Sequence, residues 1–122
     1  MPRYTALIYE IPAFANPESA EFQAIMGEYM AFGDAASAAG VMKGGEALMP
    51  VPTATTVTVP GGKGGEPLTA DGPFAETKEV LTGFYLLDCA DLDEALKWAA
   101  QIPAAWTGGK VEVRPVIDFS HP

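Results

Sequence analysis

The chain has 122 residues, enough to bury one hydrophobic core, and its 48% hydrophobic and 19% charged residues are typical of a globular protein. A single domain over residues 1–122 is therefore predicted. The 16 acidic and 7 basic residues give a formal net charge of −9, which would repel a phosphate backbone and argues against direct binding of nucleic acid.

The first half of the chain predicts a strand followed by a long helix. The strand is Arg3–Glu10, an aromatic and aliphatic run too short for a helix. The helix is predicted to begin at Asn16, a good capping residue, with Pro17 in the first helical position. Gly40 is its predicted left-handed stop. The apolar residues recur every three or four positions, as on one helical face: Phe22, Ile25, Met26, Tyr29, Phe32, Ala36 and Ala39.

A second strand and a hairpin are predicted next. Val41–Met49 has a strand pattern although it contains Gly44 and Gly45. That glycine pair indicates a bulge or a close approach of another group to the backbone, and so a candidate pocket. The β-branched run Thr53–Val59 and the segment Glu66–Thr69 are predicted to form an inserted hairpin around a glycine-rich tip.

The second half predicts a strand, a helix and a last strand. Glu79–Asp88 is the strand, and Asp91 with Glu94 forms a capping box for a helix that ends before Pro103. Lys110–Phe119 alternates apolar and charged residues, as a half-buried strand does. The residues that this helix is expected to bury are Leu92, Ala95, Leu96 and Ala99, with Trp98 and Ile102 at one side. Those that the last strand is expected to bury are Val111, Val113, Ile117 and Phe119.

The order strand, helix, strand, hairpin, strand, helix, strand is that of a split βαβ unit, so the predicted class is an α+β, ferredoxin-like fold with an antiparallel sheet and an inserted hairpin. Both helices would cover one face of the sheet. The other face would leave a large apolar patch exposed in a monomer. A homodimer formed through that face is therefore expected.

One segment resembles a known family. Asp71–Glu79 reads DGPFAETKE and is followed by Gly83-Phe84-Tyr85, a combination that resembles the signature of the YCII-related, DGPF-type family. Further matching segments extend the resemblance over nearly the whole chain: Gly40-Val41, Gly45–Leu48, Asp91–Ala95 and Val111–Val116. The resemblance implies a ferredoxin-like fold, a dimeric α/β barrel and an active-site cleft whose chemistry is not assigned.

Relatives of this family differ from the chain in one respect. Some are associated with small aromatic or lactone substrates and a proposed His-Asp catalytic pair. The first predicted helix here contains no histidine, and the sole histidine is His121 near the C-terminus. The pair cannot be carried over, so a catalytic acid or base would have to be another residue type, unless His121 folds back into the cleft.

The candidate ligand-binding residues surround one expected end of the sheet: Tyr29, Glu46, Asp71, Phe74, Glu76 and Arg114. Among them the candidates for catalysis are Asp71, Glu76 and Glu46, because carboxylates can accept or donate protons. Glu46 follows two glycines that leave room for a ligand, and Glu76 follows the tight turn of the signature. The expected cleft lies between the sheet and the first helix.

Four of the six candidates also have a simpler interpretation. Asp71 before Gly-Pro is a common way to hold a turn, which we favour. Phe74 and Tyr29 are expected to be anchored in the core. Arg114 is expected to form ion pairs with charged neighbours such as Glu112 on an alternating strand.

The chain contains one cysteine, Cys89, so it can form neither an internal disulfide nor a cysteine-based metal site. No metal and no cofactor are predicted. The start of the chain lacks the apolar stretch of a signal peptide, and no segment has the length of a membrane span. A cytoplasmic protein without membrane contacts is expected.

Two functions of different classes follow from this pattern. The first is a protein that binds or transforms a small molecule in a cleft of a dimeric α/β barrel. The second is a non-catalytic accessory or regulatory module that acts through protein contacts, since DGPF-type members are linked with extracytoplasmic-function sigma factors. Whether the chain is an enzyme stays open at this point.

Overall fold

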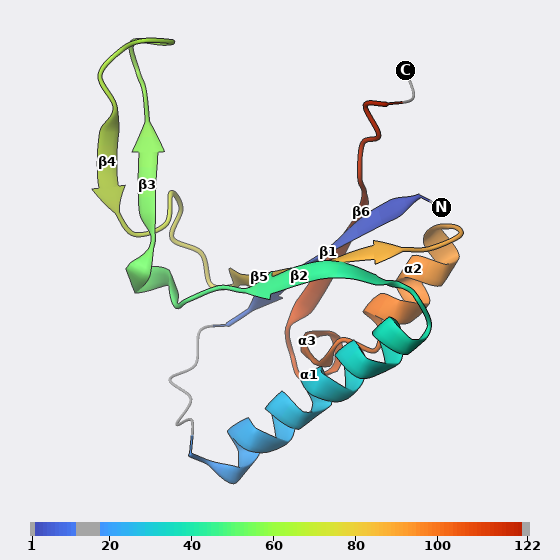
Figure 1. The fold of residues 1–122 in the computed structure, drawn as a ribbon. Coiled ribbons are helices and arrows are strands. Elements are labelled where there is room, and N and C mark those ends of the chain that lie inside the picture. Colours follow the sequence, from blue (N-terminus) through green and yellow to red (C-terminus); the bar gives the residue numbers. More distant parts are fainter. Residues whose placement is uncertain (1, 12–17, 121–122) are drawn as a thin grey trace.

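The computed structural model describes residues 2–11 and 18–120, and the expectations for Asn16, Pro17 and His121 fall outside them. Four strands form an antiparallel sheet in the order β2-β5-β1-β6. These strands are β1 (Arg3–Glu10), β2 (Met42–Ala47), β5 (Val80–Asp88) and β6 (Lys110–Pro115). Three helices lie on one face of this sheet (Figure 1): α1 (Ala20–Ala38), α2 (Leu92–Ala99) and α3 (Pro103–Trp106).

This arrangement confirms the predicted fold class. With the hairpin set aside, the chain runs strand, helix, strand, strand, helix, strand, and the last strand lies beside the first. That is the split βαβ order of the ferredoxin-like fold, an α+β architecture with its helices on one side.

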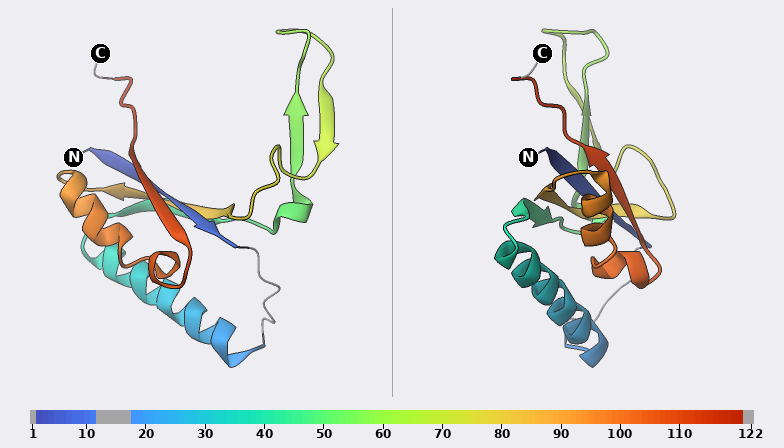
Figure 2. Two further views of the ribbon diagram at one scale, coloured as in Figure 1. Left: turned by 180° about the vertical axis from the view of Figure 1, so that it is seen from behind. Right: turned by 90° about the vertical axis from the view of Figure 1, so that its right-hand side faces the viewer.

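The inserted hairpin projects from the opposite side of the sheet. It consists of a short 3₁₀ turn (Val51–Thr53), β3 (Thr55–Thr58) and β4 (Leu68–Asp71), and β3 pairs with β4 alone. Figure 2 shows from two directions that the hairpin points away from the helices, as does the segment that follows β6. The predicted hairpin is confirmed, with a later start and an end at Asp71.

The ends of α1 depend on local signals. Ser19 caps the helix, because its side-chain oxygen accepts a hydrogen bond from the backbone nitrogen of Phe22 at 3.1 Å. The helix therefore begins at Ala20, three residues later than the position that Asn16-Pro17 suggests. At the other end Gly40 has a φ of +74°, which confirms the predicted left-handed stop.

The capping box of α2 is confirmed, because Asp91 accepts a hydrogen bond from the backbone nitrogen of Glu94 at 2.9 Å. The expected buried stripe is only half right. Ala95 is buried, whereas Leu96 is 47% exposed, because the eight-residue helix packs on the sheet through its alanines. The short helix α3 was not predicted, and Pro103 begins it in the first helical turn.

The last strand is shorter than predicted. It ends at Pro115, which pairs with Tyr4. The backbone N–H of Val116 then donates a hydrogen bond to the carbonyl oxygen of Arg3. Beyond this point β1 offers no further residues for pairing, so the chain leaves the sheet. The expected burial of Ile117 and Phe119 is wrong, and Phe119 is 88% exposed.

The core lies between the sheet and the helices. The ring of Phe32 on α1 lies 5.1 Å from the ring of Tyr85 on β5 and 6.3 Å from that of Trp98 on α2, measured between centroids. Leu87 is fully buried in the same cluster. Gly45 on β2 lies so close to Tyr85 that a Cβ atom there would be 2.7 Å from the Tyr85 ring. The close approach predicted for the glycine pair is thus present, with Tyr85 as the approaching group.

Candidate functional site

No helix of the described residues lies over the face of the sheet that points away from α1, α2 and α3, and we call it the open face (Figures 1 and 2). On β1 the buried residues alternate with half-buried ones, so Ala6 and Ile8 face the core while Leu7 and Tyr9 face the open side. Cross-strand partners share a face. The open face therefore carries Leu7, Tyr9, Phe84, Leu86, Glu112 and Arg114, with Glu46 at the β2 edge.

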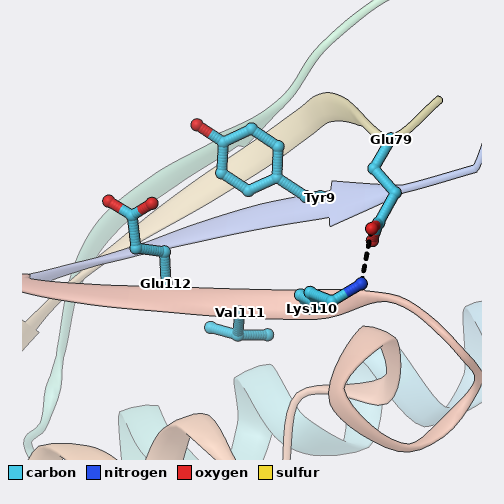
Figure 3. A pocket seen from close by; sticks show the side chains of 5 residues that line it. All are labelled: Tyr9, Glu79, Lys110, Val111 and Glu112. Carbon is cyan, nitrogen blue, oxygen red and sulfur yellow. Dashed lines mark hydrogen bonds and ion pairs between the residues drawn. The ribbon is translucent and has the colours of Figure 1, made fainter. Parts of the chain in front are cut away.

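A hollow of about 470 Å³ lies at one end of the open face (Figure 3). It is lined by Tyr9 from β1, by Glu79 just before β5, and by three residues of β6: Lys110, Val111 and Glu112. Tyr9 pairs across the strands with Lys110, which brings its ring beside the charged groups. The hollow thus combines an aromatic wall with polar groups from three elements, as ligand sites often do.

The polar centre of this hollow is an ion pair. The Lys110 ammonium donates a hydrogen bond to Oε1 of Glu79 (Figure 3). The second oxygen of this carboxylate, Oε2, is buried and has no hydrogen-bond partner among the described residues. A buried acceptor without a partner is uncommon in folded proteins.

Arg114 lies two residues from Glu112 on β6 and forms an ion pair with it. The expected pairing of Arg114 with a charged neighbour is confirmed. Both side chains are largely exposed, so the pair contributes little to stability on its own. Its effect is to hold two charges of opposite sign next to the hollow.

A second polar cluster lies on the side of the sheet that the helices cover. The hydroxyl of Tyr29 on α1 donates to Oε1 of Glu10 at 3.4 Å, and Oγ1 of Thr82 donates to the same oxygen at 2.8 Å. Burial raises the pKa of Tyr29, and the charge of Glu10 and the phenol of Tyr85 raise it further. Tyr29 therefore stays protonated and can act as a hydrogen-bond donor.

The signature loop lies between the hairpin and β5. The turn is held through Gly72, whose N–H donates to the carbonyl of Ala54 at 2.7 Å and whose carbonyl accepts from Thr56 at 2.8 Å. Asp71 is exposed at the end of β4. Phe74 is 91% exposed, so the expectation that it is anchored in the core is wrong. Among the described residues, none covers most of its ring.

Glu76 is exposed at a second, smaller hollow of about 250 Å³. This hollow lies between the signature loop and the 3₁₀ turn, and its lining is otherwise apolar or uncharged: Val51, Pro52, Pro73, Ala75, Thr77 and Val80. Among the described residues that line it, Glu76 is therefore the single charged group.

The structure places the six predicted site residues in separate regions. Tyr29 lies on the covered side of the sheet, while Glu46 and Arg114 lie on the open face but on the two opposite edge strands, β2 and β6. Asp71, Phe74 and Glu76 lie in and after the hairpin. One copy of the chain does not bring them into a single cleft between the sheet and α1, and their roles in binding or catalysis stay predictions.

Sequence reasoning missed Tyr9, Glu79 and Lys110 as members of one site. Glu79 and Lys110 are 31 residues apart and meet only through the pairing of β1 with both β5 and β6. One available signal was β1 itself, whose Leu7 and Tyr9 place apolar side chains on the face away from the core. A strand that is apolar on both faces indicates that both faces are covered or occupied.

Three further features of the described residues concern metal binding, membrane spans and the cysteine thiol. Across residues 2–11 and 18–120, no three histidine, cysteine, aspartate or glutamate side chains lie close enough together to hold a metal ion. In the same ranges, no helix has the length and apolar character needed to cross a membrane. The thiol of Cys89 is buried, and burial together with nearby Glu94 raises its pKa to about 11, so it is a poor nucleophile at neutral pH.

The order of the strands and the single covered face define the molecule as a ferredoxin-like α+β domain with an open sheet face. The chain belongs to the YCII-related domain family, whose model matches residues 2–120. An uncharacterized protein of Rhizobium meliloti (strain 1021) is 52% identical to it over 67 residues, which are 54% of this chain and 53% of that protein. The matched region thus spans about half the length of this curated relative.

Proposed function

We propose that the protein binds a small molecule over the open face, and that a second copy of the chain covers that face to form a dimeric α/β barrel. The observation that carries the proposal is the hollow between Tyr9, Glu79 and Lys110, which combines an aromatic ring with an ion pair. Concave sites with an apolar wall and a few polar groups are typical of small-molecule binding.

The second copy is supported by the apolar character of the open face. Leu7 pairs with Phe84 across β1 and β5, and neither belongs to the buried core cluster. Apolar side chains are also exposed on segments that project on this side of the sheet, among them Val57, Leu68, Ile117 and Phe119. Exposed apolar side chains on one side of the molecule support an interface between subunits.

The binding proposal can be tested with the full chain labelled for amide NMR and screened against mixtures of small neutral and charged aromatic molecules. We expect ligands to shift the amide signals of Tyr9, Lys110 and Glu112 and to raise the melting temperature by mass action. Shifts confined to the helix-covered side, around Tyr29, would place the site elsewhere. A screen without any binding at the hollow would count against the proposal.

The dimer can be tested by replacing Phe84 with glutamate. The wild-type protein is expected to have twice the 12.8 kDa mass of one chain in light-scattering measurements, and Phe84→Glu to have the mass of one chain. The reason is that each copy would bury a carboxylate in an apolar interface without a partner for its charge. The matched control is Leu96→Glu on α2, a half-exposed leucine on the helix layer, which should leave the dimer intact.

Circular dichroism separates loss of the dimer from loss of the fold in both variants. A folded wild-type protein that stays monomeric at high concentration would overturn the dimer. It would favour the alternative function, an accessory module with another protein as partner, for which the exposed Phe74 is the best anchor because large exposed aromatic side chains often dominate interfaces.

The compartment is a further part of the proposal. We place the protein in the cytoplasm because a lone cysteine that is buried and reduced is compatible with a reducing environment.

A further inference from the structure

The inserted hairpin is left largely uncovered by the described residues of its own chain. Its strands β3 and β4 form a sheet of their own. All the residues of β4 are exposed, and so are those of β3 apart from Thr56. A two-stranded hairpin by itself is marginally stable at best in water and becomes stable when it packs against another surface. The hairpin is therefore expected to pack against something other than these residues.

The segment that leads into the hairpin and forms β3 has an unusual composition. Residues 48–62 contain no charged side chain, although 19% of the residues of the chain are charged. Large apolar side chains are nevertheless exposed within it: Leu48, Met49, Val57 and Val59. Depletion of charge on an exposed surface is typical of the centre of a protein interface.

The charge of the whole chain indicates what covers this segment. With a formal net charge of −9, two copies of the chain repel each other over most of their surfaces. A basic partner would be attracted to acidic surface, and a segment without charge would give it no advantage. Two copies can approach closely where charge is absent. Residues 48–62 therefore suit a second copy of this chain.

The position of the hairpin agrees with a second copy over the open face. The hairpin projects on the same side of the sheet as that face (Figures 1 and 2). Because a strand rises about 3.3 Å per residue, residues 55–59 extend over about 13 Å, whereas two sheets that pack face to face lie about 10 Å apart. The hairpin is thus long enough to reach the sheet of a copy packed on the open face.

The two faces of the hairpin differ in how much of them is free. Val57 and Leu68 belong to neighbouring cross-strand pairs, so their side chains lie on opposite faces. On the face of Leu68, the hydroxyl of half-buried Thr56 donates a hydrogen bond to the carbonyl of Gly72 in the signature loop at 2.8 Å. The other face is exposed at each residue of β3 and β4 that it contains, and its one charge is at the base of the hairpin: Thr55, Val57, Thr69 and Asp71.

We propose that the hairpin is an arm that holds the second copy of the chain, with the face of Val57 packed against that copy. In a two-fold dimer each copy holds the other in the same way. This inference rests on the proposed function, and it adds the hairpin to the open face as a second contact between the two copies.

Substitutions on the two faces of the hairpin test the arm. Val57→Glu should raise the dissociation constant of the dimer about 10-fold or more, because a carboxylate would be buried without a partner. Leu68→Glu is the matched control on the opposite face, since Leu68 is 56% exposed and Val57 59%, and it should dimerise as the wild type does. Analytical ultracentrifugation over a series of concentrations measures both constants.

A second variant removes the apolar side chain of Val57 without adding charge. Val57→Ser should also weaken the dimer, by a smaller factor than Val57→Glu. Neither variant should change the circular dichroism spectrum, because Val57 lies outside the buried core.

The contact itself can be detected in a mixed dimer of one isotope-labelled and one unlabelled copy. Filtered NOE spectra should show contacts from the methyl groups of Val57 to protons of the unlabelled copy. Leu96, on the helix layer, should show none.

The outcomes distinguish the arm from the proposed function. If Phe84→Glu is a monomer while Val57→Glu dimerises as the wild type does, the dimer through the open face stands and the arm is overturned. Equal weakening by Val57→Glu and Leu68→Glu would overturn the face assigned to the contact. A wild-type protein that stays monomeric at high concentration would overturn both the arm and the dimer of the proposed function.

Discussion

Replacing Leu87 with alanine is expected to lower the free energy of unfolding by about 2–5 kcal/mol. Leu87 is fully buried and lies on β5, a central strand, where it pairs with Tyr4 on β1 and with Met42 on β2. Truncation would remove apolar contacts and leave a cavity between the sheet and the helices. Denaturant unfolding followed by circular dichroism should show a lower midpoint with an unchanged slope.

The matched control is the same substitution at Leu92, which is 45% exposed at the first residue of α2. Leu92→Ala should cost less than about 1 kcal/mol, because little apolar surface returns to water and alanine is a good helix former. Equal losses for the two variants would contradict the position of Leu87 in the core. They would also contradict the finding that α2 packs through its alanines.

Parts of the fold that depend on neighbouring residues could be predicted from the sequence. The capping box of Asp91 and Glu94 is decided within four positions, and so is the stop at Gly40. The alternating and helical patterns then indicate the element order, which leaves few possible arrangements. The fold class followed from that order before any contact between distant residues was known.

Other parts depend on what distant segments do. Phe119 was expected in the last strand because its spacing is right, but β1 has no residues left to pair with it. Leu96 is exposed because α2 packs on the sheet through its alanines. The spacing of apolar residues along a helix does not predict which of them will face the sheet. Such errors arise where tertiary packing decides between two positions that have the same local pattern.

The candidate site was harder to predict for the same reason. The pairing of Glu79 with Lys110, and that of Tyr29 with Glu10, join residues that are 31 and 19 positions apart. Both require the strand register, which a one-residue slip would change completely. Within the signature segment Asp71 and Glu76 were the candidates, whereas the ion pair with Lys110 is formed by its last residue, Glu79.

Replacing Gly45 with alanine is expected to destabilise the protein by about 2–4 kcal/mol, because strain and overpacking would act together. A Cβ atom at this position would lie 2.6 Å from the carbonyl oxygen of Phe84 and 2.7 Å from the ring of Tyr85. The first of these atoms belongs to the backbone of the neighbouring strand and cannot move without breaking the pairing. The φ of +157° is also a value that residues with a side chain rarely adopt.

Gly44, the preceding residue, provides a matched control for this substitution. A Cβ atom there would meet only the end of the Leu86 side chain, at an ordinary contact distance of 3.7 Å. Gly44→Ala should therefore change the free energy of unfolding by less than about 1 kcal/mol. If both variants were equally stable in denaturant unfolding, β2 could not lie against Tyr85 as described. A loss confined to Gly45→Ala would show that Gly45 alone serves the packing of Tyr85 against Phe32, and that the space expected at this glycine is filled by the protein's own core.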